Sequence, residues 1–170
     1  AAARPAPGVL DAISAADLLV LAPSNPYVSL LPILDVPGVR EAVVASAAPA
    51  VAVSPLIGGR AVRGPLDRML RRMAGDTTPA ALAALYPGLL DALVVDTADA
   101  GGEAGVPLVA AATLMPDREA ARRLARSARA LGQSSAVRRA RRDIDAGDRG
   151  SIWPRSLRRC ARGGRGAPRG

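Results

Sequence analysis

Two turn sequences hold the residues of this chain whose types and spacing suit the binding of a phosphate or carboxylate group. The first turn, Pro23 to Pro26, places a serine and an asparagine directly after a short apolar run. The second turn, Ser54 to Pro65, has glycines that permit positive φ and close backbone approach, and arginines that offer forked donors to an oxyanion. The candidate binding residues are Ser24, Asn25, Ser54, Gly58, Gly59, Arg60, Arg63 and Gly64.

Each turn also has a plainer interpretation. Ser24 or Asn25 can act as the cap of the helix that follows, because a side-chain oxygen at that position accepts a backbone N–H. Capping and ligand binding are compatible. The Gly-Gly-Arg sequence at 58–60 can be a flexible loop with solvated arginines. The sequence alone leaves both interpretations open.

Three acidic residues form another candidate cluster. Asp96, Asp99 and Glu103 follow an apolar run, and their carboxylate oxygens could hold a divalent cation. Their spacing fits no ion-binding motif, so we interpret them as a solvated loop and predict no metal site. The chain has no histidine and one cysteine, Cys160, which excludes a zinc cluster and a Ser-His or Cys-His nucleophile pair from its body.

These candidate residues need a scaffold that brings the two turns together. Apolar runs that predict strands alternate along the chain with segments that carry helical spacing or capping signals. The expected strands are 17–22, 49–54, 93–96 and 106–114, and the expected helices are 9–16, 27–34, 37–46, 65–74, 78–86 and 116–131. This alternation predicts an α/β, Rossmann-like layered fold with a mostly parallel sheet. Ligands bind beyond the carboxyl ends of such strands, where Ser24 and Ser54 stand.

Three further predictions concern individual residues and faces of the expected helices. Pro37 suits the first position of its helix, because its missing N–H would be unpaired there in any case. Met69 and Met73 share helical spacing with two leucines and are interpreted as core filler rather than as a cofactor site. One face of the last helix is expected to carry Ala121, Leu124, Ala128 and Leu131.

The positive charge lies at the C-terminal end of the chain. The net charge is +8, and all 23 basic residues are arginines. Residues 1–130 hold 12 arginines against 12 acidic residues, whereas residues 131–170 hold 11 arginines against three aspartates. Because it has few apolar residues, the segment 132–170 predicts a disordered basic tail. An RNA-binding tail and an out-of-frame or read-through extension are the alternatives. Trp153 is its single aromatic residue, so nucleic acid is not an expected partner.

No segment predicts a membrane span or a secretion signal. The chain has no apolar run of the length that crosses a bilayer, and its N-terminus lacks a basic stretch followed by an apolar one. A single cysteine cannot form an internal disulfide and suits a reducing compartment. We therefore expect a cytoplasmic protein with no membrane partner.

Several short motifs occur in a specific order and spacing. They are Ala22 to Ser29, Pro32 to Arg40, Val53 to Pro65, Leu85-Tyr86, Leu93 to Asp96 and Thr113 to Asp117. Together they resemble the 2-phospho-L-lactate transferase, or CofD-like, family. The resemblance covers roughly residues 9–131 and implies an incomplete fold, the C-terminal half of the family's domain, after a lead-in at 1–8 and before the tail at 132–170. Ala112 departs from the family pattern, in which a carboxylate is expected.

The resemblance implies a step in the synthesis of coenzyme F-420. The family transfers a phospholactyl group, or a phosphoenolpyruvyl group in bacteria, from a guanosine-diphosphate-activated donor to the deazaflavin Fo, and releases GMP. A magnesium ion assists, with its ligands expected in the missing N-terminal half. The eight candidate residues are assigned to the nucleotide or phosphate side of the cleft, and no catalytic residue is carried over.

Further expectations concern the isolated chain and its partners. Without the N-terminal half, the chain by itself is expected to be inactive, although a full-length family member could form a homodimer. The alternative function is that of the sister CofD-like proteins, which are non-enzymatic regulators that bind nucleotide sugars. Those proteins resemble Gly-Pro-Gly-Ser-Leu-Tyr at the first turn. This chain has Ala22 to Tyr27, Ala-Pro-Ser-Asn-Pro-Tyr, which favours the transferase.

Overall fold

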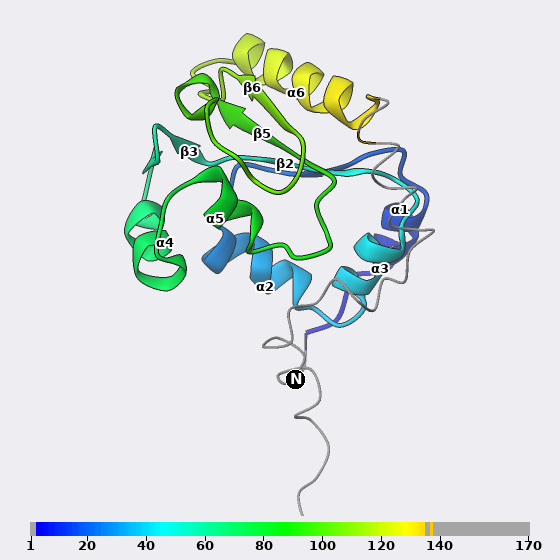
Figure 1. Cartoon of the computed structure of the whole chain (residues 1–170). Helices are drawn as coiled ribbons and strands as arrows, with labels where there is room; N and C mark the ends of the chain where they lie inside the picture. Colours follow the sequence, from blue (N-terminus) through cyan, green and yellow to red (C-terminus); the bar gives the residue numbers. More distant parts are fainter. Residues whose placement is uncertain (1–2, 135–136, 138–170) are drawn as a thin grey trace, which may run out of the picture.

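The computed structural model describes residues 3–134 and Val137, and a four-stranded sheet lies at its centre (Figure 1). The order of the strands is β1-β2-β5-β6, and every neighbouring pair is parallel. The register pairs Val51 with Val20 on one side and with Ala92 on the other. The strands are β1 (Leu19–Leu21), β2 (Ala50–Val53), β5 (Ala92–Asp96) and β6 (Leu108–Ala111). The prediction of an α/β fold with a mostly parallel sheet is confirmed.

Helices cover both faces of this sheet (Figure 1). Side chains alternate between the faces of a strand, so a strand buried on both faces is apolar throughout, as β2 and β5 are. Val51 and Val94 pack against α6 (Arg118–Gly132). Ala52 and Leu93 belong to the core on the opposite face, which is covered by α2 (Leu31–Leu34), α3 (Val39–Ala45) and α5 (Pro79–Ala83). The short helix α1 (Val9–Ser14) packs against α3.

The chain between β2 and the next helix contains an antiparallel hairpin, so this segment has regular structure where an irregular loop was one interpretation, although its two arginines are exposed as that interpretation expected. The strands β3 (Leu56–Ile57) and β4 (Arg60–Ala61) pair across a two-residue turn. Gly58 and Gly59 form this turn with φ of 56° and 67°, and positive φ at both positions is what a tight hairpin of this hand requires. The hairpin leads directly into α4 (Leu66–Ala74). Leu56, Leu66 and Leu70 form a third apolar core beside the sheet.

The helix termini follow local capping, with one correction. Thr78 and Asp117 cap α5 and α6, and of these two caps the sequence indicated Thr78. Pro37 is not the first residue of its helix, because α3 begins at Val39 and Gly38 is the N-cap with φ of +89°. A proline ring fixes φ near −65°, so only the glycine can adopt this left-handed conformation. Proline therefore lies in the turn before the cap.

Two predicted helix faces are also corrected. Met73 is 63% exposed and Met69 is partly buried, so α4 contributes only its two leucines as fully buried core residues. The apolar surface beneath α4 is formed by the small hairpin together with Tyr27 and Leu85 rather than by the sheet. In α6 the first fully buried residue is Ala120 rather than Ala121, since the helix begins immediately after Asp117.

The predicted tail at 132–170 lies almost wholly outside the described residues. Of the residues in that range that are described, Gly132 ends α6 against Leu18, and Val137 is fully buried with the core of α6. Among the described residues, β1 pairs only with β2, and its Val20 is 50% exposed. No helix in the described part of the chain is long and apolar enough to cross a membrane.

Candidate functional site

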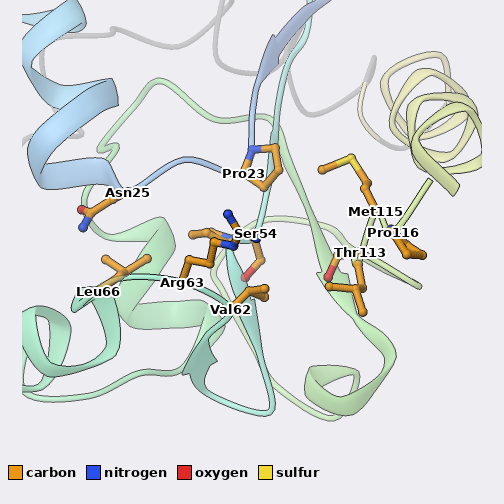
Figure 2. A pocket seen from close by; sticks show the side chains of 11 residues that line it. Pro23, Asn25, Ser54, Val62, Arg63, Leu66, Thr113, Met115 and Pro116 are labelled. Atoms are coloured by element: carbon orange, nitrogen blue, oxygen red, sulfur yellow. The ribbon is translucent and has the colours of Figure 1, made fainter. Parts of the chain in front are cut away.

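A cleft of about 510 Å³ opens beyond the carboxyl ends of the parallel strands (Figure 2). Three segments line it: the turn after β1, the segment that runs from the end of β2 through the hairpin to α4, and the residues after β6. The fold brings these segments together because parallel strands end at the same edge of a sheet. The lining residues are Pro23, Asn25, Ser54, Pro55, Val62, Arg63, Leu66, Thr113, Leu114, Met115 and Pro116.

Asn25 and Ser54 contribute the polar groups that follow β1 and β2. The Oδ1 atom of Asn25 accepts the N–H of Tyr27 at 3.0 Å and caps η1 (Pro26–Leu30), a single π-helical turn. Its Nδ2 atom lies 3.6 Å from the sulfur of Met69. Ser54 is buried, and its hydroxyl accepts the N–H of Leu56 at 3.1 Å. The capping role is thus filled by Asn25, and both side chains are held in fixed orientations at the cleft.

Arg63 is the cationic residue of the cleft. It follows β4, and Figure 2 shows it between Asn25 and Leu66 on one side and Thr113 and Met115 on the other. No ion pair between described residues includes Arg63, whereas Arg40 and Arg71 are paired with carboxylates. A guanidinium without a carboxylate partner can offer its forked N–H donors to an anionic ligand.

The structure brings together three of the eight residues that the sequence predicted. Asn25, Ser54 and Arg63 line the cleft. Ser24 lies in the same turn without lining it, and Arg60 is exposed on β4. The predicted glycines at 58, 59 and 64 also lie outside the lining set. Their positive φ is confirmed, but their proposed contact with a ligand phosphate stays a prediction.

The backbone N–H groups of the Gly-Gly turn are already occupied by a carboxylate. Gly58 N–H donates to Asp99 Oδ2 at 3.0 Å, and Gly59 N–H donates to Asp99 Oδ1 at 2.9 Å. A Cβ atom on Gly59 would lie 2.9 Å from the hydroxyl oxygen of Thr77, so this glycine is also required by close packing. Asp99 is thus a partly exposed but hydrogen-bonded residue of this loop rather than a freely solvated one.

Asp96 is likewise hydrogen-bonded rather than freely solvated, and it is buried. Its Oδ2 atom accepts both the N–H and the hydroxyl of Thr113, each at 3.0 Å. Its Oδ1 atom accepts the Ala98 N–H at 3.1 Å and the Thr97 hydroxyl at 3.3 Å. Burial by itself raises the pKa of the Asp96 carboxyl, but these four hydrogen bonds outweigh it and hold the pKa below its usual value.

Sequence reasoning missed the apolar part of the cleft. Val62, Leu114 and Met115 are 53%, 51% and 43% exposed, although each has a large apolar side chain. The sequence carried one signal for this apolar surface. Apolar residues stand immediately after the ends of strands, where the chain turns to the surface. The lining is thus mixed, with an apolar surface beside Arg63 and the two polar side chains.

The described residues do not fit the magnesium ion that the sequence resemblance implied. No group of three or more His, Cys, Asp or Glu side chains gathers anywhere in the described part of the chain. Asp96 and Asp99, the carboxylates that hydrogen-bond to Thr113 and to the hairpin turn, use their oxygens to accept protein hydrogen bonds. We therefore derive no step through a metal from these residues.

An open parallel sheet with a mixed polar and apolar cleft beyond its strand ends defines an α/β protein of the small-molecule-binding type. The chain belongs to the family described as 2-phospho-L-lactate transferase CofD, whose profile matches residues 1–127.

Named relatives agree with this assignment. The chain is 48% identical over 137 residues to a phosphoenolpyruvate transferase of Kitasatospora aureofaciens, an alignment that covers 77% of this chain and 43% of the relative. It is 39% identical over 126 residues to a phosphoenolpyruvate transferase of Mycolicibacterium smegmatis, with 71% and 38% covered. It is 41% identical over 96 residues to a 2-phospho-L-lactate transferase of Methanothermobacter thermautotrophicus, with 56% and 31% covered. The chain thus spans less than half the length of these relatives.

Proposed function

We propose that the cleft is the donor-binding wall of a transferase of coenzyme F-420 synthesis. The donor would be a three-carbon acid, lactate or the enol of pyruvate, joined through its oxygen to the terminal phosphate of guanosine diphosphate, so that the transferred group is phospholactyl or phosphoenolpyruvyl. The acceptor would be the deazaflavin Fo. Family membership supports the reaction class, and relatives carry the names phosphoenolpyruvate transferase and 2-phospho-L-lactate transferase. The observation that carries the placement of the donor is Arg63, a cation without a carboxylate partner among the described residues, at the strand-end cleft.

In the proposed reaction an acceptor hydroxyl of Fo attacks the phosphorus atom that carries the acid. A new phosphorus–oxygen bond forms to Fo, the bond to the second phosphate breaks, and GMP leaves with that electron pair. The hydroxyl proton passes to water. Phosphoryl transfer of this kind depends mainly on positioning and on neutralising the charge of the transferred group. It needs no nucleophilic side chain, and the sequence indicated none.

Each polar residue of the cleft would have a separate role in binding the donor. Arg63 would face the diphosphate, since a guanidinium binds phosphate oxygens through two parallel N–H bonds. Asn25 and Ser54 would orient the donor beside it, because each is held by a hydrogen bond to the backbone. The apolar side chains of Val62, Leu114 and Met115 offer a water-poor surface for a ring system. Hydrogen bonds strengthen in such surroundings.

Binding of GDP to the 170-residue chain tests this proposal. We expect calorimetry to show binding that Arg63→Gln weakens roughly tenfold or more, because a charge-assisted hydrogen bond contributes about 1.5 to 3 kcal/mol. Arg60→Gln is the matched control: this arginine lies in the same hairpin, is exposed, and does not line the cleft. Equal losses in the two variants, or no GDP binding by the parent chain, would contradict the assignment.

The proposal has further parts that rest on the family resemblance. Magnesium, a cytoplasmic location and a homodimer of the full-length protein belong to it. So does the inactivity of this chain in isolation, because the described residues supply no metal-ligand set for the reaction. Turnover of Fo by the purified chain, detected as the release of GMP, would contradict the expected inactivity.

A further inference from the structure

Two carboxylates, one just before a short turn and one at its end, accept hydrogen bonds from opposite walls of the cleft. The turn η2 (Thr97–Asp99) is a single 3₁₀ turn that follows β5, an inner strand of the sheet. Asp96, the last residue of β5, binds Thr113 on the wall that follows β6. Asp99, the last residue of η2, binds the Gly58–Gly59 turn of the hairpin on the other wall. Neither carboxylate lines the cleft itself.

The contact of Asp99 fixes the hairpin at its tip. Its two oxygens accept two successive backbone N–H groups, at 3.0 and 2.9 Å, so the carboxylate sets both the position and the direction of the turn. The hairpin is only two residues wide on each strand, and its second strand ends two residues before Arg63. The placement of Arg63 in the cleft is therefore tied to the position of this turn.

The contact of Asp96 fixes the opposite wall at its first residue. Two groups of Thr113, the N–H and the hydroxyl, donate to the same oxygen of a buried carboxylate. Leu114, Met115 and Pro116 follow directly and line the cleft. Between described residues, no hydrogen bond joins this wall directly to the segment from Leu56 to Arg63. The two walls are connected through η2.

We propose that Asp96 and Asp99 are positioning residues that set the separation of the two cleft walls and hold Arg63 opposite Leu114 and Met115. The choice of GDP as the ligand rests on the proposed function. The arrangement of the two walls does not, because it is a property of the protein without any ligand. A change at Asp99 should then act on the ligand through Arg63, although Asp99 itself does not touch the ligand. That dependence separates positioning from general stabilisation.

The first experiment follows backbone amide exchange in the 170-residue chain by NMR. In Asp99→Asn one amide oxygen replaces two carboxylate oxygens, so at least one of the Gly58 and Gly59 N–H groups loses its acceptor. We expect their exchange to accelerate tenfold or more while that of the Thr113 N–H is unchanged. Thr113→Val, a mild variant of the other contact, should perturb the wall after β6 and leave the glycine amides protected. Unchanged protection of the glycine amides in Asp99→Asn would overturn the proposal.

The second experiment is a double-variant cycle with GDP as the probe. We expect Asp99→Asn to weaken GDP binding several-fold, and to weaken it little further once Arg63→Gln is present, because both variants remove the same contact. Asp35→Asn is the matched control, since Asp35 is an exposed carboxylate paired with Arg40 and does not line the cleft. Its effect should be small and additive with that of Arg63→Gln. Additive losses for Asp99→Asn and Arg63→Gln would overturn the positioning role.

The two proposals fail in distinguishable ways. If the parent chain binds no GDP, the proposed function fails, and the position of Arg63 is read instead from the NMR resonance of its side-chain Nε–H. That resonance should shift in Asp99→Asn and stay unchanged in Asp35→Asn. An unshifted resonance in Asp99→Asn would overturn the positioning role without reference to any ligand.

Discussion

The Oδ2 atom of Asp96, the last residue of β5, accepts both the backbone N–H and the hydroxyl of Thr113, each at 3.0 Å, two residues beyond the adjacent parallel strand β6. This pairing links the end of β5 to the residue that begins one wall of the cleft. Because Asp96 is buried, the free energy of these contacts depends on its charge. The first prediction follows from that dependence.

The stability of the protein should fall in acid through Asp96. Its pKa in the folded state lies below its usual value, because four hydrogen bonds to the carboxylate outweigh the effect of burial. The stabilisation is therefore present above the unfolded pKa of about 3.9 and is lost as pH falls through the folded pKa. Asp96→Asn should lower the unfolding free energy at neutral pH by about 1 to 3 kcal/mol and flatten the acid dependence.

Urea unfolding at several pH values measures this effect. Asp35→Asn is the control, and its exposed pair with Arg40 should contribute only about 0 to 1 kcal/mol. An acid profile that is as steep in Asp96→Asn as in the parent chain would contradict the assignment.

Alkaline conditions should destabilise the fold through Tyr86. This tyrosine is 3% exposed in the core beneath the sheet, and burial raises its pKa well above the usual value, with Arg40 opposing the shift and Tyr27 adding to it. The raised pKa gives stability that is fully present below the unfolded pKa of about 10 and is lost as pH rises above it. Tyr86→Phe should flatten the decline above about pH 10. An unchanged slope in denaturant titrations would argue against this role.

Gly59 should tolerate substitution less well than a glycine of the same backbone conformation elsewhere. Gly59 and Gly88 both have φ of 67°, so alanine at either position meets the left-handed backbone cost of about 1 to 2 kcal/mol. At Gly59 the new Cβ would also lie 2.9 Å from the Thr77 hydroxyl oxygen, whereas nothing lies within 4 Å at Gly88. Gly59→Ala should therefore destabilise the protein more than Gly88→Ala. Thermal unfolding of both variants decides this, and equal shifts of Tm would remove the packing argument.

The apolar core under α4 should depend on Leu70 and not on Met73. Leu70 is fully buried with Leu56 and Leu66, and truncation of such a leucine to alanine costs about 2 to 5 kcal/mol. Met73 is 63% exposed on the same helix, so Met73→Ala should change the unfolding free energy by less than about 0.5 kcal/mol. Comparable losses in the two variants would show that the helix packs differently.

The sequence by itself determined the four strands of the parallel sheet, the helices between them and the position of the cleft at the strand ends. Apolar runs such as Ala50–Val53 and Ala92–Asp96 predict strands that are buried on both faces. The caps at Thr78 and Asp117 depend on backbone N–H groups only three residues away. Parallel strands end at one edge, so Asn25 and Ser54 were placed together without any knowledge of contacts. These features depend on residues close in sequence or on the direction of the strands, so they can be predicted from the sequence.

Only the tertiary structure decided which polar groups meet. The partners of Asp99 are 40 and 41 residues away, and the partner of Asp96 is 17 residues away. No spacing rule predicts such pairs, because they depend on where the hairpin and the segment after β6 fold against η2. Exposure differs between the two methionines of α4 for the same reason, since helical spacing gives a face but not the width of the surface beneath it. Long-range packing therefore turned a predicted solvated loop into the connection between the two walls of the cleft.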